Sequence, residues 1–144
     1  KGDHPGFVEQ VDDRTLLIPE RAGNHLCIGL QNILHDPRVG LMIVRPATDE
    51  VLRISGLATL HDDADLCERL SAGGKPAVLV IRVAVERAAF HCVRSARRAH
   101  LWEPDMWDAP TRISFGKIYA DALAQPELRE TFDRLTEESD SKLY

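Results

Sequence analysis

Two long stretches of alternating apolar and polar residues constrain the fold of this chain more than any other feature. In residues 51–60 and again in residues 77–90, apolar side chains recur at every second position. A period of two is that of a β-strand with one covered face. Gly56 interrupts the first stretch and predicts a β-bulge or a close backbone approach. In the second stretch the alternation places Arg82 and Glu86 together on the polar face. The centre of the chain is therefore predicted to be a β-sheet.

Shorter elements lie around these two long strands. Further strands are expected at residues 5–11, 15–19 and 39–44, and helices at about 24–35, after Asp62 or Asp63, from Ser114 and from Pro126. Asn24 is the predicted N-cap of the first helix. Pro37 ends that helix, because the residue before a proline avoids the α region. Residues 39–44 are apolar on both faces, which favours a central strand.

The order of these elements predicts an antiparallel sheet. It reads β-β-α-β-β-α-β followed by C-terminal helices, so hairpins outnumber parallel crossovers. Five or six antiparallel strands can close into a small barrel. The expected fold class is therefore mainly β, a β-barrel with flanking helices.

The composition limits the possible partners. The 144 residues suffice for one domain with a core, and the net charge of -5 argues against general nucleic-acid binding. No apolar run approaches the roughly 20 residues that span a bilayer. Cys27, Cys67 and Cys92 make neither a disulfide framework nor a zinc pattern, and the first two fall on apolar helical stripes that predict core positions. We therefore expect a cytoplasmic protein without a metal, a membrane or a nucleic acid as partner.

A basic stretch at residues 90–102 is unusual in this acidic chain. It contains three arginines, two histidines and no acidic residue. Arginine forks match the oxygens of phosphate and carboxylate, so the stretch is a candidate anion site. The alternative interpretation is a solvated basic helix or turn, which is common on protein surfaces. The charge pattern alone leaves both interpretations open.

Five sequence motifs follow one another along the chain. They are residues 2–8 (GDHPGFV), 17–24 (LIPERAGN), 32–41 (NILHDPRVGL), 52–58 (LRISGLA) and 91–95 (HCVRS), the last continued by Arg98 and Leu101–Trp102. This series resembles the pyridoxamine 5'-phosphate oxidase-like, FMN-binding split-barrel proteins, in an uncharacterised bacterial branch. The resemblance extends from residue 2 to about residue 107.

The resemblance implies a six-stranded antiparallel split β-barrel that forms a homodimer. A single split-barrel domain is expected over residues 1–144, with the barrel at about 1–107, C-terminal helices at about 111–140 and the first barrel strand either missing or upstream of Lys1. FMN is expected in a cleft at the subunit interface. The implied function is that of an FMN-dependent oxidoreductase, in which the flavin exchanges two electrons with an unknown small molecule. No catalytic residue is implied at a fixed position.

The resemblance also implies a set of cofactor-binding residues. Those expected around the phosphate, ribityl chain and ring of FMN are Lys1, Ile18, Pro19, Arg21, Asn24, Arg53, Arg94, Arg98 and Trp102. Lys1 stands where the family usually has an arginine that could face the phosphate. Ile18 and Pro19 lie on the strand expected beside the ring, and Arg21 and Asn24 lie in the loop that follows it.

Four positions depart from the family pattern. Leu26, Ile28, Gly29 and Val51 replace a basic residue, an acidic residue, a serine and a threonine, so each change removes a hydrogen-bonding group. These changes favour an alternative function, a non-catalytic dimeric split-barrel binding module that has lost or weakened flavin binding. A third alternative is another cofactor, haem or a deazaflavin, since two histidines of the basic stretch keep haem open.

Overall fold

The computed structural model describes residues 3–4, 6–23, 26–48, 50–109, 111 and 113–140 of the chain. The chain forms two compact units, Lys1–Pro104 and Asp105–Tyr144. The predicted contacts at Lys1 and Asn24 lie outside the described residues.

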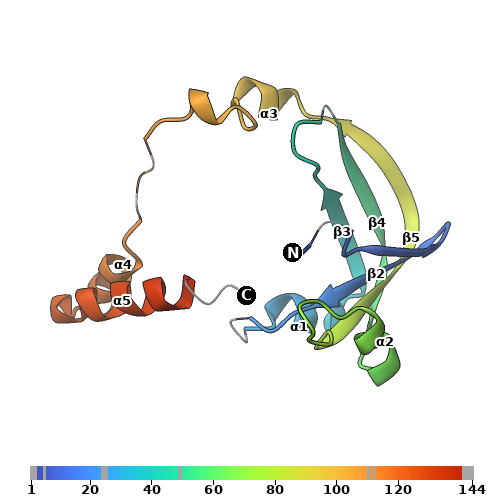
Figure 1. The fold of residues 1–144 in the computed structure, drawn as a ribbon, viewed down its shortest axis with the longest axis horizontal. Coiled ribbons are helices and arrows are strands. Elements are labelled where there is room, and N and C mark those ends of the chain that lie inside the picture. Colours follow the sequence, from blue (N-terminus) through green and yellow to red (C-terminus); the bar gives the residue numbers. More distant parts are fainter. Residues whose placement is uncertain are drawn as a thin grey trace. The chain divides into compact units, whose positions relative to one another are not determined.

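The first unit is built on a five-stranded antiparallel sheet in the spatial order β1-β2-β5-β4-β3 (Figure 1). Its strands are β1 (Glu9–Asp12), β2 (Thr15–Glu20), β3 (Arg38–Ile43), β4 (Glu50–His61) and β5 (Leu79–Cys92). The long strands β4 and β5 are paired from Glu50–Cys92 to His61–Val80. The predicted mainly-β, antiparallel class is therefore confirmed, and within the described residues the sheet is open, with β1 and β3 at its edges.

A β-bulge interrupts the pairing of the two long strands. Ser55 is paired with Arg87, whereas the next residue of β4, Gly56, is paired with Val85. A Cβ atom on Gly56 would lie 2.1 Å from the carbonyl oxygen of Ala84, so only glycine fits at this position. The bulge predicted at Gly56 is confirmed.

Short helices cover the two faces of the sheet at one end. Helix α1 (Ile28–His35) packs Leu30 and Ile33 on the cluster that contains Ile81. Helix α2 (Ala64–Arg69) and the turn after it cover the opposite face around Val80. Because successive residues of a strand point to opposite faces, Val80 and Ile81 of β5 each belong to one of these two cores.

Several local predictions are wrong. Helix α1 begins after Cys27, which has a positive φ of 51°, so Asn24 is not its N-cap. Cys27 is exposed, whereas Cys67 of α2 is buried as predicted. Strand β3 is an edge strand of the described sheet rather than a central one, and Met42 stays exposed on it.

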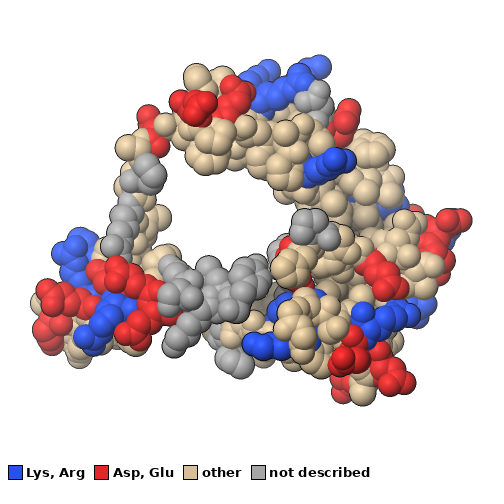
Figure 2. All heavy atoms as spheres, viewed as in Figure 1, with Lys and Arg blue, Asp and Glu red and all other residues tan. Residues whose placement is uncertain are grey.

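The second unit contains two helices that pack against each other, and the carboxylate of Asp133 links them. Helix α4 (Phe115–Leu123) is followed by the 3-10 helix η2 (Pro126–Leu128) and by α5 (Arg129–Asp140). Ser114, the predicted N-cap, accepts a hydrogen bond from the backbone N–H of Lys117 at 2.9 Å. Asp133 of α5 accepts hydrogen bonds from the Ser114 hydroxyl and from the Gly116 N–H. Figure 2 shows acidic and basic side chains mixed over α4 and α5.

Candidate functional site

Arg21 directly follows β2 and is partly withdrawn from solvent. Its Nε donates a hydrogen bond to Asp3 Oδ2 at 2.6 Å, and the exposed fractions of the two side chains are 27% for Arg21 and 6% for Asp3. The Nη1 of Arg21 is buried and has no hydrogen-bond partner among the described residues. A buried donor without an acceptor costs free energy, so this atom is suited to an oxyanion that arrives with a ligand.

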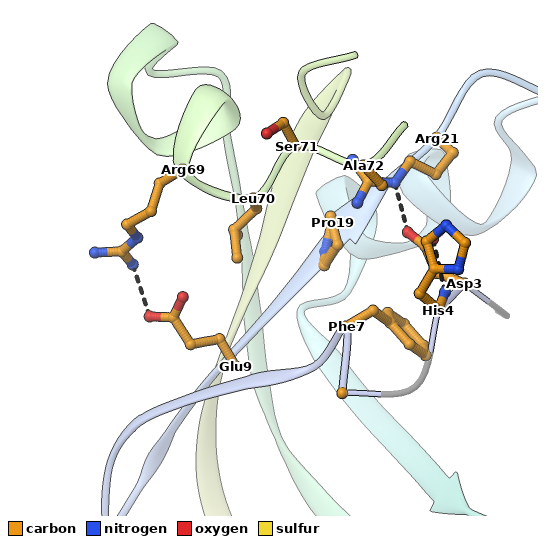
Figure 3. A pocket seen from close by; sticks show the side chains of 11 residues that line it. Asp3, His4, Phe7, Glu9, Pro19, Arg21, Arg69, Leu70, Ser71 and Ala72 are labelled. Atoms are coloured by element: carbon orange, nitrogen blue, oxygen red, sulfur yellow. Dashed lines mark hydrogen bonds and ion pairs between the residues drawn. The ribbon is translucent and has the colours of Figure 1, made fainter. Parts of the chain in front are cut away.

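The first of three cavities, the Asp3 cavity, lies on one side of Arg21 and has a volume of about 320 Å³. Figure 3 shows the ion pair Arg21–Asp3 on one side of it and the ion pair Arg69–Glu9 on the other, with Pro19 and Leu70 between them. The hydrogen bond from Arg21 lowers the pKa of the Asp3 carboxyl, and the backbone N–H of His4 lowers it further. Asp3 therefore stays ionised and orients the guanidinium.

The second cavity, the α1 cavity, also contains Arg21 and has a volume of about 480 Å³. It is lined by the loop before α1, by the first turn of that helix and by apolar residues of α1 and β5, including Ile33 and Ile81. The first N–H groups of a helix lack a carbonyl partner within it and carry partial positive charge. The first turn of α1 has no acidic residue, and Cys27 provides no side-chain cap. The α1 cavity thus combines Arg21 and a helix N-terminus with an apolar wall, and Glu20 is its acidic lining residue.

The third cavity, the sheet cavity, lies on β3, β4 and β5 and has a volume of about 630 Å³. Its charged side chains are Arg53 of β4 and Arg87 of β5, and His91 of β5 lies beside them. None of its lining residues belongs to the two cavities that share Arg21.

Residues 1–92 match the family described as pyridoxamine 5'-phosphate oxidase. The chain belongs to the pyridoxamine 5'-phosphate oxidase family. The match covers the whole described sheet of the first unit. It ends before the helix α3 (Arg94–Arg98).

Two solved structures of Group A Streptococcus HupZ are similar to this family member. The first has a TM-score of 0.48 and 17% sequence identity, over 58% of this chain and 68% of that chain. The second, a histidine-to-alanine variant of the same protein, has a TM-score of 0.48 and 18% identity, over 59% and 73% of the two chains. No curated protein matches the chain.

The structure brings only some of the predicted cofactor residues of this family member together. Pro19 and Arg21 both line the Asp3 cavity, and Ile18 is buried next to them in the core under α1. Arg53 lies in the sheet cavity instead. Its predicted contact with FMN stays a prediction.

The basic stretch begins in the last residues of β5 and continues into the short helix α3. Arg94 and Arg98 are exposed on the short helix α3, and Trp102 is half-buried in the turn after it. Figure 2 shows Lys and Arg side chains gathered over α3. None of these three residues lines any of the three cavities, so their role as cofactor contacts stays a prediction.

Three residues of the cavities were not identified from the sequence. Asp3 and Arg69 meet the rest of the Asp3 cavity only through tertiary packing, so no local pattern marks them. Arg87 could not be identified from the alternation of residues, because the bulge shifts the register of β5. A strict alternation places Glu86 opposite β4 on the face of Arg82, but Glu86 is the unpaired extra residue of β5, and Arg87 lies opposite Ser55 instead.

The described residues contain neither a metal-binding cluster nor a membrane-spanning helix. Within these residues, no three His, Cys, Asp or Glu side chains come together as a metal site. No described helix has the length and apolar character needed to cross a membrane.

Proposed function

We propose that this protein is an FMN-dependent oxidoreductase of the pyridoxamine 5'-phosphate oxidase family and that it acts on a small molecule. The observation that carries the proposal is the buried Nη1 of Arg21, which has no partner in the described part of the chain and lies at the junction of two cavities. The family match over residues 1–92 supports the choice of flavin as the ligand. Bound FMN supplies two-electron transfer, while the protein holds and orients it.

The α1 cavity fits the two chemical halves of FMN. Arg21 and the N-terminus of α1 offer donors to a phosphate, which is a recurrent use of helix N-termini. Ile33 and Ile81 offer an apolar wall to the ring. The replacements at Ile28 and Gly29 remove an acidic and a hydroxyl side chain, yet both residues contribute to the first turn of α1, whose backbone N–H groups remain available.

The rim of the α1 cavity supports a homodimer with the cofactor at the interface. Leu26, Ile28 and Val78 line this cavity and expose 60%, 59% and 59% of their surface. Apolar side chains grouped around a ligand cavity are typical of an interaction surface. Members of this family are commonly dimeric, and we infer that a second copy covers this rim.

Titration of FMN with the full chain tests the cofactor. We expect FMN fluorescence to be quenched, and we expect Arg21→Gln to weaken binding about 10- to 150-fold, since one charge-assisted hydrogen bond contributes roughly 1.5–3 kcal/mol. Arg38→Gln is the matched control, because Arg38 is an exposed arginine that pairs with Asp36 and lines none of the three cavities. Saturating FMN that keeps its full fluorescence with the wild-type protein contradicts the proposal.

One observation supports the alternative function, a dimeric binding module that does not bind flavin. Leu26 is exposed on the rim of the α1 cavity, where the family pattern has a basic residue. If the wild-type protein leaves FMN fluorescent, Leu26→Arg is expected to restore quenching. A variant that also fails to bind FMN shows that the α1 cavity is not a flavin site, and then neither function is supported there.

A further inference from the structure

We propose that the sheet cavity is a second ligand site, which binds a small organic anion through Arg53 and Arg87. The cavity shares no lining residue with the two cavities around Arg21, so within one copy this site is distinct from both of them. The ligand class is a small molecule that carries carboxylate or phosphate groups on an organic body.

The register of the sheet places the two arginines on one face. Arg53 of β4 is paired with Ala89 of β5, and Ser55 of β4 is paired with Arg87. Paired residues project from the same face, so the two guanidinium groups occupy diagonal positions on neighbouring strands, at a typical separation of about 7–8 Å. That spacing allows one polyatomic anion to receive hydrogen bonds from both forks.

The β-bulge at Gly56 creates this arrangement. Without the extra residue, the alternation from Arg82 would place Glu86 near Arg53 and neutralise it. With the bulge, Arg87 lies opposite Ser55. Bulges re-aim side chains and recur next to functional sites, and this one pairs a basic residue instead of an acidic one with Ser55, beside Arg53.

The charge of the two arginines is not balanced within the described chain. No acidic residue lines the sheet cavity, and neither Arg53 nor Arg87 makes a side-chain hydrogen bond or ion pair with the described residues. Arg21, Arg38 and Arg69 each pair with a carboxylate. Two like charges on neighbouring strands destabilise a sheet, so an anion that binds between them is favoured.

The shape of the cavity suits an organic ligand. Gly40, Ser55 and Ala89 are small residues beside the two arginines, and a Cβ on Gly40 would meet nothing within 4 Å. The volume of about 630 Å³ lies within the usual range for small-molecule sites. Met42 exposes 68% of its surface on the same cavity and offers an apolar contact to the body of the ligand.

An NMR titration of the full chain with two probe anions tests this site. Citrate and inorganic pyrophosphate are added separately to uniformly ¹⁵N-labelled protein, first without FMN and then with FMN at saturation. We expect amide shifts at Gly40, Ser55 and Ala89 with at least one probe in both conditions. The probe that binds more tightly distinguishes a carboxylate ligand from a phosphate ligand. Failure of FMN binding leaves this test unchanged.

Single-arginine variants identify the groups that hold the anion. Arg53→Gln and Arg87→Gln are each expected to weaken probe binding at least about tenfold, because each removes a charge-assisted hydrogen bond. Arg82→Gln is the matched control on the same face of β5. Arg82 lies opposite Leu17 and Thr59 and lines none of the three cavities, so its variant is expected to bind the probes within about twofold of wild type.

Two results overturn the proposal. Amide shifts confined to the loop after Arg21 and to α1, or equal affinities in all three variants, place anion binding elsewhere. A wild-type dimer that binds neither probe and becomes monomeric in both Arg53→Gln and Arg87→Gln shows instead that the two arginines pair with acidic groups of a second copy.

Discussion

At the scale of single residues, the pairing of each arginine decides what it can do. Arg38 is held by the carboxylate of Asp36. Its Nε and Nη2 donate to the two carboxylate oxygens, and its backbone N–H donates to the same group. Arg21 donates a hydrogen bond to Asp3 through Nε. Its Nη1 has no partner among the described residues, and we propose that it binds a ligand. Arg53 and Arg87 make no side-chain pair with the described residues. The hydrogen-bond partners therefore distinguish the structural Arg38 from the three arginines that we propose as ligand-binding residues. The charge, which is the same in all four, does not.

The Asp36–Arg38 pair gives a prediction for the pH dependence of one group. The hydrogen bonds from Arg38 lower the pKa of the Asp36 carboxyl from 3.8 to about 2. A lowered pKa in the folded state stabilises that state above pH 3.8, and the contribution is lost as the pH falls through about 2. A ¹³C NMR titration of the side-chain carboxyl should show a midpoint near 2, and Arg38→Gln should return it toward 3.8. The same midpoint in both proteins contradicts the assignment.

The sequence predicts some site residues and cannot predict others. Arg21 and Pro19 were named from the family resemblance, and both lie in the Asp3 cavity. Asp3 is 18 residues from Arg21 in the chain, so only the fold brings them together. Arg87 was not identified, because the bulge changes the period of β5 by one residue and brings Arg87 opposite Ser55.

At the scale of elements, the bulge at Gly56 is a point where substitution has a defined cost. Gly56→Ala puts a Cβ atom 2.1 Å from the Ala84 carbonyl oxygen, so β4 and β5 must separate locally. Overpacking of this kind costs about 1–3 kcal/mol, and the upper end is favoured because the atoms in the way belong to the backbone of Ala84 and Val85. Urea denaturation should show this loss in the free energy of unfolding.

Gly40→Ala is the control for that prediction. Gly40 lies on β3 opposite Ser55, and its added Cβ meets nothing within 4 Å. Its free energy of unfolding should therefore remain within about 0.5 kcal/mol of wild type. Equal losses in the two variants would mean that the register of β4 and β5 differs from the one described.

The order of elements was predictable, whereas their exact starts and neighbours were not. Alternation identified β4 and β5, and the cap at Ser114 was identified from its residue type. The start of α1 was missed because Cys27 takes a left-handed conformation that no local pattern marks. The edge position of β3 was missed because apolar residues on both faces are equally compatible with an edge that another surface covers.

At the scale of the whole molecule, the exposed apolar surface is the main feature that one copy leaves unexplained. Six strands were expected, and the described residues form five, with β1 and β3 unpaired on their outer sides within this part of the chain. Leu26, Ile28 and Val78 stay exposed around the α1 cavity. Sequence periodicity cannot predict such a surface, because an interface residue and a core residue have the same apolar character.

A homodimer that covers the α1 cavity gives the last prediction. Two copies of 16.1 kDa should elute together at about 32 kDa in size-exclusion chromatography with light scattering. In a two-fold dimer each substitution occurs twice, and each buried Leu or Ile side chain contributes about 1.5–3 kcal/mol. Leu26→Asp or Ile28→Asp should therefore weaken the dimer by at least about a hundredfold and weaken FMN binding with it.

Leu135→Asp is the matched control for the dimer. Leu135 exposes 52% of its surface on α5 of the second unit, and it lines none of the three cavities. This variant should keep both the mass of the wild-type protein and its affinity for FMN. A wild-type protein that binds FMN as a 16.1 kDa monomer would separate cofactor binding from dimerisation. In that case Arg21 and the first turn of α1 hold the cofactor within one copy, and the apolar rim has another partner.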